Sequence, residues 1–332
     1  MIQQVNGVDI ADLCGWKPNP AGVTSILNDP SNPFPDFTNA TYNLRGQFAA
    51  DMEETLLYEP LLWADPSYRR GAQAIGSCVA WGAELAATLI TAKMAYKSRS
   101  KKRYAEAATE AIYGGCRVET NGGRRGGYSD GAYGAAAAQF MKEWGVVYRK
   151  DYSQETGISE HDLSQYSGSK EKEWGNWGCG GRNDGGKLDQ VAKGNPVKLI
   201  SKVNSFDDVA AAIAISKCPV TIASDYGCSM RRDRNGFCSR SGSWSHQMCL
   251  IGVRFDKPGA LCAQSWGPNV ASGPKYPASM PDNIAGFTWW IPARDVDWIC
   301  RSGDCWAIGD YANWRRDRTD FKKIFNRFTI GA

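Results

Sequence analysis

The run from Val79 to Tyr96 constrains the fold more than any other stretch, because it contains no proline and a single glycine, Gly82. Its apolar residues recur at helical spacing, which predicts an amphipathic or largely buried helix. That stripe consists of Trp81, Leu85, Leu89, Ala92 and Tyr96. A helix of this length and apolarity needs other layers to cover it, so we expect a substantial core.

Cys78 stands directly before this helix, at the end of a loop that contains Gly71 and Gly76. The unpaired backbone N–H groups at a helix N-terminus, together with the helix dipole, favour a thiolate over a thiol. Cys78 is therefore a candidate nucleophile. Free cysteine is also a common buried residue, so a purely structural role remains the alternative at this point.

The two halves of the chain differ in character. Further helices are expected over 104–113, 130–143 and 209–215, and residues 153–195 suggest a loop-rich insertion. Strands are expected over 195–200, 219–223, 247–253, 260–265 and 286–291. We therefore predict an α+β chain with two unlike lobes. Its parts would be an N-terminal extension (1–60), a helical lobe with the nucleophile (61–195), a β-rich lobe (196–300) and a C-terminal tail (301–332).

Charge and composition exclude several classes. The net charge of +4 is too weak and too dispersed to indicate a nucleic-acid partner. No apolar run approaches a membrane span, and the first residues lack the pattern of a signal peptide. The eleven cysteines are an odd number, and we expect most to be reduced. A cytoplasmic or virion-associated protein is therefore expected.

The chain has two histidines, so a search for a catalytic base is short. His161 is flanked by acidic residues, and we expect it to be exposed. His246 directly precedes an apolar strand, from which its ring could be aimed across a cleft, although a half-buried structural role is the alternative. The spacing of Cys300 and Cys305 could suggest a metal site, but no second cysteine pair stands at zinc-finger spacing and histidines are few. We therefore expect neither a metal site nor a cofactor.

Several motifs, each weak alone, occur in one order. They are Gly76-Ser77-Cys78 with Trp81, Gly126-Gly127-Tyr128, Trp144-Gly-Val-Val-Tyr148 with Tyr152, His246 before an apolar strand, Ser265-Trp266-Gly267, and Gly286-Phe-Thr-Trp-Trp-Ile291. In this order and spacing, over roughly residues 71–295, the chain resembles the papain-like cysteine peptidases.

The resemblance implies a papain-like fold, in which a helical N-terminal lobe and a β-barrel-like C-terminal lobe enclose an active-site cleft. It implies that Cys78, beside Ser77, attacks the scissile carbonyl and that His246 pairs with the thiolate. Gly126, Gly127 and Tyr128 would bind an extended polypeptide substrate, and Trp266 would shield the histidine from water.

Three positions depart from the family pattern. Gln264 stands where the family has the asparagine that orients the histidine, and Gln73 is the candidate oxyanion donor although it lies one residue closer to the cysteine. Ile75 replaces a cysteine of the usual disulfide. No family propeptide is recognisable in residues 1–60, although this extension could still occlude the cleft.

The function expected from these residues is that of a cysteine endopeptidase with a Cys78–His246 dyad. One alternative is a catalytically weakened structural or binding protein on the same scaffold, such as a virion or assembly component, with its partner bound through the terminal extensions. Another is a different Cys–His acyl-transfer hydrolase, such as a cell-wall amidase.

Overall fold

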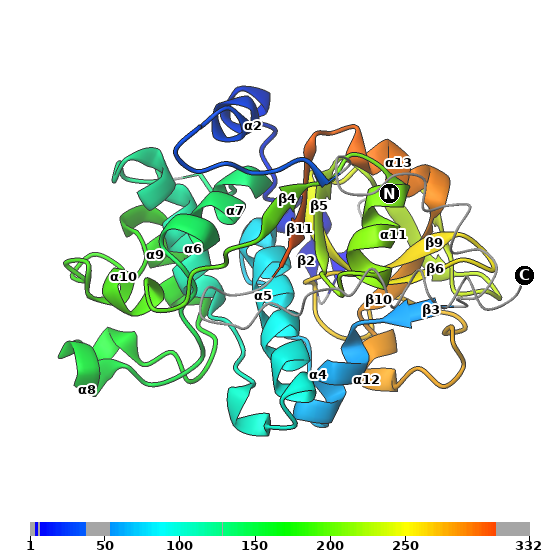
Figure 1. The fold of residues 1–332 in the computed structure, drawn as a ribbon, viewed down its shortest axis with the longest axis horizontal. Coiled ribbons are helices and arrows are strands. Elements are labelled where there is room, and N and C mark those ends of the chain that lie inside the picture. Colours follow the sequence, from blue (N-terminus) through cyan, green and yellow to red (C-terminus); the bar gives the residue numbers. More distant parts are fainter. Residues whose placement is uncertain (1–3, 6, 38–53, 128, 310–332) are drawn as a thin grey trace, which may run out of the picture.

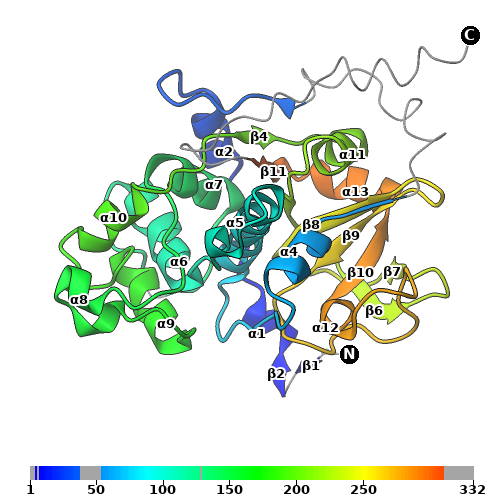
Figure 2. The same cartoon turned by 60° about the horizontal axis from the view of Figure 1, so that its bottom comes forward.

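The structure is a computed structural model that describes residues 4–5, 7–37, 54–127 and 129–309. Helices gather on one side and strands on the other, with α5 (Cys78–Lys97) between them (Figures 1 and 2). This helix is buried on nearly every face, from Cys78 to Ala95. The predicted helix over 79–96 thus forms the shared core of both halves.

The helical half packs around α5 and α6. Its elements are α4 (Tyr58–Ala64), η2 (Lys101–Arg103), α6 (Thr109–Arg117), η3 (Glu119–Asn121), α7 (Gly134–Glu143), α8 (Ser153–Thr156), η4 (Ser159–His161), α9 (Gly168–Trp177) and α10 (Lys187–Ala192). Three of these helices and η4 occupy the stretch that we expected to be a loop-rich insertion. That stretch is polar because its helices are short and mostly solvent-facing, with single anchors such as Trp174 buried against α6.

The other half is a seven-stranded sheet in the order β10-β9-β8-β5-β11-β4, with β3 also paired to β8. Its strands are β3 (Glu54–Leu56), β4 (Ile200–Lys202), β5 (Val220–Ser224), β8 (His246–Arg254), β9 (Gly259–Ala263), β10 (Thr288–Pro292) and β11 (Asp304–Ile308). Every strand pairing in it is antiparallel. Among the described residues no pairing closes this sheet into a barrel. Strand β8 is buried along its whole length and packs directly on α5.

The remaining elements are short. They are β1 (Gln4–Val5), β2 (Val8–Asp9), α1 (Ile10–Leu13), α2 (Pro20–Leu27), β6 (Cys228–Arg232), β7 (Cys238–Arg240), α11 (Phe206–Ala214), α12 (Asp282–Ala285) and α13 (Ala293–Cys300). No helix in the described ranges is long and apolar enough to cross a membrane.

Strand β11 corrects the predicted C-terminal tail. We expected the tail to begin at residue 301, but Asp304–Ile308 is an interior strand that pairs with both β5 and β4. Each of its residues is buried. The β-rich half therefore extends to Ile308, and residues 310–332 fall outside the described ranges.

A buried ion pair joins the two halves beside α5. The Arg70 guanidinium contacts the Glu84 carboxylate, and both side chains are about 2 % exposed. The same guanidinium donates to the Trp81 carbonyl at 2.7 Å and to the Gln264 carbonyl at 3.4 Å. One cation thus ties the first turn of α5 to the loop after β9.

Replacing this cation tests the contribution of the junction to stability. In Arg70→Met the Glu84 charge stays buried without its partner, so we expect a loss of about 3–5 kcal/mol in the free energy of unfolding, measured by urea denaturation. Arg70→Met/Glu84→Met should recover part of that loss, because neither charge remains. Lys150→Met, at an exposed ion pair, is the control. A loss below about 1 kcal/mol in the single variant would contradict this role.

Candidate active site

Cys78 begins α5 and its side chain is fully buried. Two backbone amides from distant parts of the chain donate to its Sγ atom, Gly15 N–H at 3.3 Å and Gln247 N–H at 3.4 Å. Ser77, at the N-cap position, is also buried, and its carbonyl accepts from the amides of Ala80 and Trp81 in the first turn of the helix. The candidate nucleophile is therefore held at the contact between α5, β8 and the N-terminal segment.

Gln247, the residue after the candidate base, fixes this contact. Its side-chain amide donates to the Val79 carbonyl at 2.9 Å. Gly82 lets the strand come close, since a Cβ there would lie 3.1 Å from the Gln247 side chain. Gln247 was not predicted as a site residue, because an amide in an apolar strand carries no chemical signature of its own.

His246 opens β8 and is 1 % exposed. Its ring lies against the Trp266 indole, with ring centroids 4.4 Å apart and planes inclined by 30°. Trp244 packs edge-on against the same indole, with centroids 5.0 Å apart. Neither ring nitrogen of His246 has a hydrogen-bond partner in the described part of the chain. Aromatic side chains therefore pack around the ring, and no hydrogen bond from a described residue orients it.

Burial determines the charge state of both candidate groups. It raises the pKa of Cys78 to about 11, although backbone N–H groups, chiefly those of Gln247 and Gly15, act to lower it. Burial also lowers the pKa of His246 to about 3. The sequence predicted a thiol acidified by the helix N-terminus, and this structure reverses that expectation. Both groups are neutral at pH 7, because water is excluded from them.

Gln73 bridges the two halves next to the candidate nucleophile. Its carbonyl oxygen accepts from the Ser265 hydroxyl at 2.5 Å, which fixes the direction of the amide. Its NH₂ group donates to the backbone carbonyls of Leu13 and Ile75, both at 2.7 Å. Gln73 is thus a pre-aimed donor to peptide carbonyls, as an oxyanion donor must be. In this structure the N-terminal segment occupies it.

Gln264 makes no hydrogen bond to the His246 ring, whereas the resemblance implied that it orients this ring. Its carbonyl oxygen accepts from the Trp266 backbone amide, and its NH₂ group donates to the Gly267 carbonyl at 3.0 Å. The methylene that distinguishes glutamine from asparagine lets the amide fold back onto its own turn. The position that should orient the histidine therefore stabilises the loop after β9.

The Gly126-Gly127 pair, expected to bind substrate, lies against a different partner. The Arg117 guanidinium donates to the carbonyls of Gly126 and Gly127, at 2.7 and 3.1 Å. It also donates to the Gly131 carbonyl and the Gly175 carbonyl, which ties these loops into one wall. Tyr128 lies outside the described residues. The residue of this region whose backbone pairs with the N-terminal segment is Ala132, which was not predicted from the sequence.

Residues 13–17 run through the space between the two halves, and the chain is extended from Cys14 onward, where α1 has ended at Leu13. Trp16 forms a parallel bridge with Ala132, in which Ala132 N–H donates to the Gly15 carbonyl at 2.9 Å and Lys17 N–H donates to the Ala132 carbonyl at 2.8 Å. On the opposite side, Trp16 N–H donates to the Ser245 carbonyl at 2.9 Å, next to His246. Figure 2 shows α1, which leads into this peptide, between the helical and sheet halves.

Two side chains anchor this peptide. The Trp16 indole N–H donates to the buried Asp304 carboxylate at 2.8 Å, and Lys17 donates to the Ser129 hydroxyl at 2.9 Å. Asp304 also accepts from the Gly134 amide at 2.6 Å and from the Trp306 indole at 2.8 Å. At Gly15 there is no room for a side chain, since a Cβ would lie 1.7 Å from the Gly76 carbonyl oxygen.

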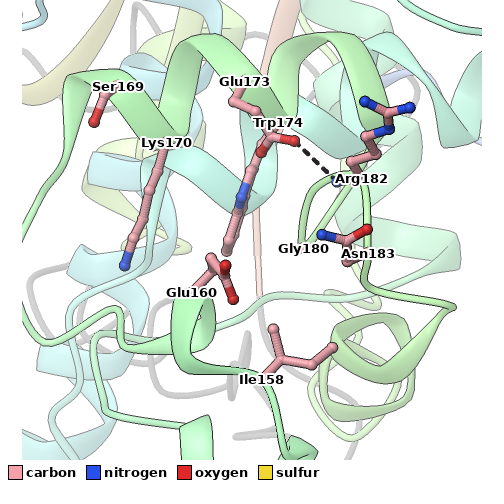
Figure 3. A pocket seen from close by; sticks show the side chains of 9 residues that line it. All are labelled: Ile158, Glu160, Ser169, Lys170, Glu173, Trp174, Gly180, Arg182 and Asn183. Atoms are coloured by element: carbon pink, nitrogen blue, oxygen red, sulfur yellow. Dashed lines mark hydrogen bonds between the residues drawn. The ribbon is translucent and has the colours of Figure 1, made fainter.

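A separate cavity of about 310 Å³ lies among α9, η4 and the loop at 180–183 (Figure 3). Charged side chains of both signs line it, including Glu160, Lys170 and Arg182. His161 nearby is fully buried, not exposed as the sequence suggested, because Thr156 and the Gly180 carbonyl satisfy both ring nitrogens at 2.9 and 3.0 Å. The Cys78 site does not contribute to this cavity.

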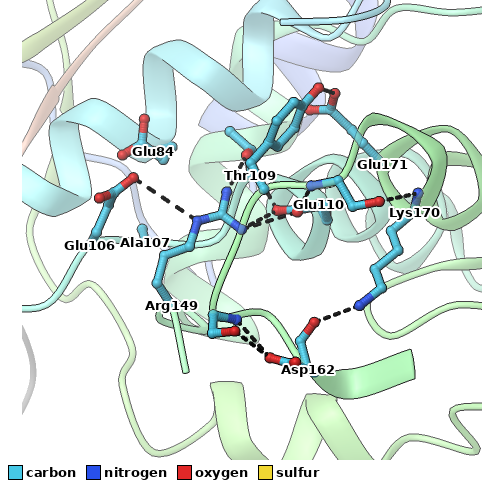
Figure 4. A network of polar contacts seen from close by, with 12 residues as sticks. Glu84, Glu106, Ala107, Thr109, Glu110, Arg149, Asp162, Lys170 and Glu171 are labelled. Carbon is cyan, nitrogen blue, oxygen red and sulfur yellow. Dashed lines mark hydrogen bonds and ion pairs between the residues drawn. The ribbon is translucent and has the colours of Figure 1, made fainter. Parts of the chain in front are cut away.

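A cluster of acidic side chains surrounds Arg149 (Figure 4). Arg149 pairs with Glu110 at 2.8 Å, and the Tyr166 hydroxyl donates to Glu171 at 2.6 Å. Tyr166 also accepts from the Ala74 amide in the loop before Cys78. Burial raises the pKa of Glu171 to about 8, so this acid is mainly protonated at neutral pH. In the described ranges no cluster of His, Cys, Asp or Glu side chains is arranged to hold a metal ion.

This arrangement is the fold of the papain-like cysteine proteases. Xylellain, a cysteine protease from Xylella fastidiosa, matches with a TM-score of 0.57 at 15 % identity, over 93 % of this chain and 98 % of that one. Procathepsin B S9 from Trypanosoma congolense matches with a TM-score of 0.51 at 10 % identity, over 92 % of this chain and 90 % of that one. No family model and no curated protein matches the sequence.

Glu171 gives a pH-dependent prediction for stability. Its pKa in the folded chain, about 8, exceeds the ordinary value of 4.5, so its contribution to stability is complete below pH 4.5 and is lost as the pH rises toward 8. In Glu171→Gln the Tyr166 acceptor remains but the titration does not. We expect the variant to gain stability relative to the wild type between pH 4.5 and 8, by at most about 1.4 kcal/mol per pH unit.

Urea denaturation across this pH range measures the difference, and Glu155→Gln, at an exposed glutamate, is the control. A pH-independent difference for Glu171→Gln would show that Glu171 ionises as readily in the folded chain as in the unfolded one, which would contradict the raised pKa.

Proposed function

We propose that this chain is a cysteine endopeptidase, in which Cys78 is the nucleophile and His246 the base. The observation that carries the proposal is the extended peptide in the cleft. Its backbone pairs with Ala132 on one wall and with the Ser245 carbonyl on the other, and its Gly15 amide meets the Cys78 sulfur. A cleft that binds a main chain in this way suits a polypeptide substrate and needs no particular side chain at most positions.

The chemistry requires that residues 13–17 leave the cleft. Water entry would then lower the desolvation cost that keeps both groups neutral, so that a proton could pass from Cys78 to His246. The thiolate would attack the scissile carbonyl carbon, with the Gln73 NH₂ group donating to the developing oxyanion. His246 would return its proton to the leaving amine, and water would hydrolyse the acyl-enzyme.

A second function, that of a catalytically weakened binding protein, has its own supporting observation. Gln264 faces its own turn, and no residue in the described ranges donates to or accepts from the His246 ring nitrogens. A base without such a partner loses part of its catalytic advantage. On this alternative the cleft and the terminal extensions serve assembly with a partner.

Opening the cleft by mutation tests whether residues 13–17 cover the nucleophile. A Cβ at position 15 would collide with the Gly76 carbonyl oxygen, so Gly15→Ala should displace the segment. We expect iodoacetamide to alkylate Cys78 at least roughly tenfold faster in this variant at pH 7, as measured by peptide mass spectrometry. Ala21→Val, at an exposed position of α2, is the control. Equal rates in the variant and the wild type would contradict the covering role.

The pH profile of the same alkylation separates the two functions. In the wild type, a thiol pKa of about 11 predicts a rate that rises about tenfold per pH unit from pH 7 to 10. In Gly15→Ala, an endopeptidase should show a plateau at lower pH, because the imidazolium stabilises the thiolate. Adding His246→Ala should remove that plateau.

Hydrolysis of an unfolded protein by Gly15→Ala, abolished in Gly15→Ala/Cys78→Ala, should accompany the plateau. The weakened binding protein predicts neither plateau nor hydrolysis. Hydrolysis of peptidoglycan in place of protein would identify an amidase.

A further inference from the structure

Cys14 lies directly before the residue that touches the candidate nucleophile. It is half-exposed, whereas the ten other cysteines of the chain are buried, and all eleven are free thiols. The Gly15 nitrogen is 3.3 Å from Cys78 Sγ. The Cys14 Cα atom is two covalent bonds from that nitrogen, about 2.4 Å, and therefore lies within about 5.7 Å of the Cys78 sulfur.

The charge environment of Cys14 agrees with this placement. Its pKa is raised to about 12. Burial is the largest cause, and the nearby Cys78 is the next, ahead of Asp225 and Asp9. The Cys14 sulfur is about 2.8 Å from its own Cα, and an S–S bond spans about 2.05 Å, so the bond can join Cα positions up to about 4.9 Å from the partner sulfur. Rotation of the Cys14 side chain, with a shift of residues 14–15 by at most about 1 Å, therefore brings the two sulfurs to bonding distance.

We propose that Cys14 and Cys78 form a reversible disulfide that locks residues 13–17 in the cleft and blocks the nucleophile under oxidising conditions. The oxidant is a small-molecule disulfide, such as oxidised glutathione. One protein thiol loses its proton and attacks it, forming a mixed disulfide and releasing one small thiol. The second protein thiol, also deprotonated, then attacks the protein sulfur of that mixed disulfide and releases another small thiol.

Two electrons pass in total from the two cysteines to the oxidant, which becomes two small thiols. Reduction by a dithiol reverses both steps. The second step is favoured because the hydrogen bonds at Trp16 and Lys17 already hold Cys14 beside its partner. Both thiols are protonated at neutral pH in this structure, so the bond should form faster as the pH rises.

The disulfide itself does not depend on catalysis, whereas its effect as an activity switch rests on the proposed endopeptidase function. The lock also differs in kind from simple coverage of the cleft. Coverage depends on noncovalent contacts and is relieved by Gly15→Ala, while the disulfide would hold the segment covalently until it is reduced.

The test oxidises the purified full chain with oxidised glutathione at pH 8.5, blocks residual thiols with N-ethylmaleimide, and maps proteolytic peptides by mass spectrometry without reduction. We expect a crosslinked pair of peptides containing Cys14 and Cys78, which dithiothreitol separates. In Cys14→Ser the oxidised protein should instead carry Cys78 as a free thiol or a glutathione adduct. In Cys78→Ser only a glutathione adduct on Cys14 should form.

Separate glutathione adducts on Cys14 and Cys78 in the wild type would overturn the proposal. So would a Cys14–Cys14 bond between two molecules, or no modification of Cys14. The crosslink without any protein hydrolysis by reduced Gly15→Ala would leave the disulfide established and the endopeptidase function refuted. Hydrolysis without the crosslink would give the opposite result, so the two failures are distinguishable.

Discussion

The packing of β8 on the first turn of α5 is the interaction on which the site depends. Gln247 reaches across it twice, with its backbone amide on the Cys78 sulfur and its side chain on the Val79 carbonyl. Since β8 is also a buried interior strand of the sheet, the start of this strand cannot move without disturbing the core. The packing of β8 on α5 therefore positions both His246 and Cys78, so the candidate site belongs to this interface and not to either half alone.

The same burial explains why Cys78 and His246 are both uncharged at neutral pH in this structure. A helix N-terminus stabilises a nearby anion by about 0.3–1 kcal/mol, and by about 2 kcal/mol in favourable cases. The rise of the Cys78 pKa from 9.0 to about 11 corresponds to about 2.7 kcal/mol in the opposite direction, net of the N–H groups that contact the sulfur. Desolvation outweighs the helix, so access of water to the cleft, and not the local sequence around the cysteine, decides whether a thiolate can exist.

The sequence predicted features that leave a periodic or positional signal. The apolar periodicity of 79–96 and the apolar run after His246 gave α5 and β8 within a residue or two. Features set by backbone contacts over long sequence separations left no such signal. The pairing of Trp16 with Ala132 uses only main-chain groups. Strand β11 is short and begins with an acid, Asp304, whose two indole partners cannot be read from the sequence, so it resembles a tail when its neighbouring strands are unknown.

The glycine motif shows the same limit in a different way. Gly126-Gly127 and Gly131-Ala132 both precede α7, and only the observed backbone bridge between Trp16 and Ala132 shows which pair contacts residues 13–17. The side chain of Gln264 is a related case. Its identity as an amide was visible in the sequence, but whether an additional methylene turns it toward His246 or back onto its own loop depends on the packing of Trp266.

The orientation of residues 13–17 explains why the proposed endopeptidase would not cut its own segment. Gly15 points its N–H at the Cys78 sulfur, so the sulfur lies near the plane of the Cys14–Gly15 peptide group. Attack on a carbonyl carbon requires approach from above that plane, which this geometry does not provide. The parallel pairing with Ala132 maintains the mismatch, because it fixes both the Gly15 carbonyl and the Lys17 amide. A substrate peptide would meet the same groups if its carbonyl pointed toward Gln73 and its peptide plane were rotated by about 90° from that of the Cys14–Gly15 peptide group.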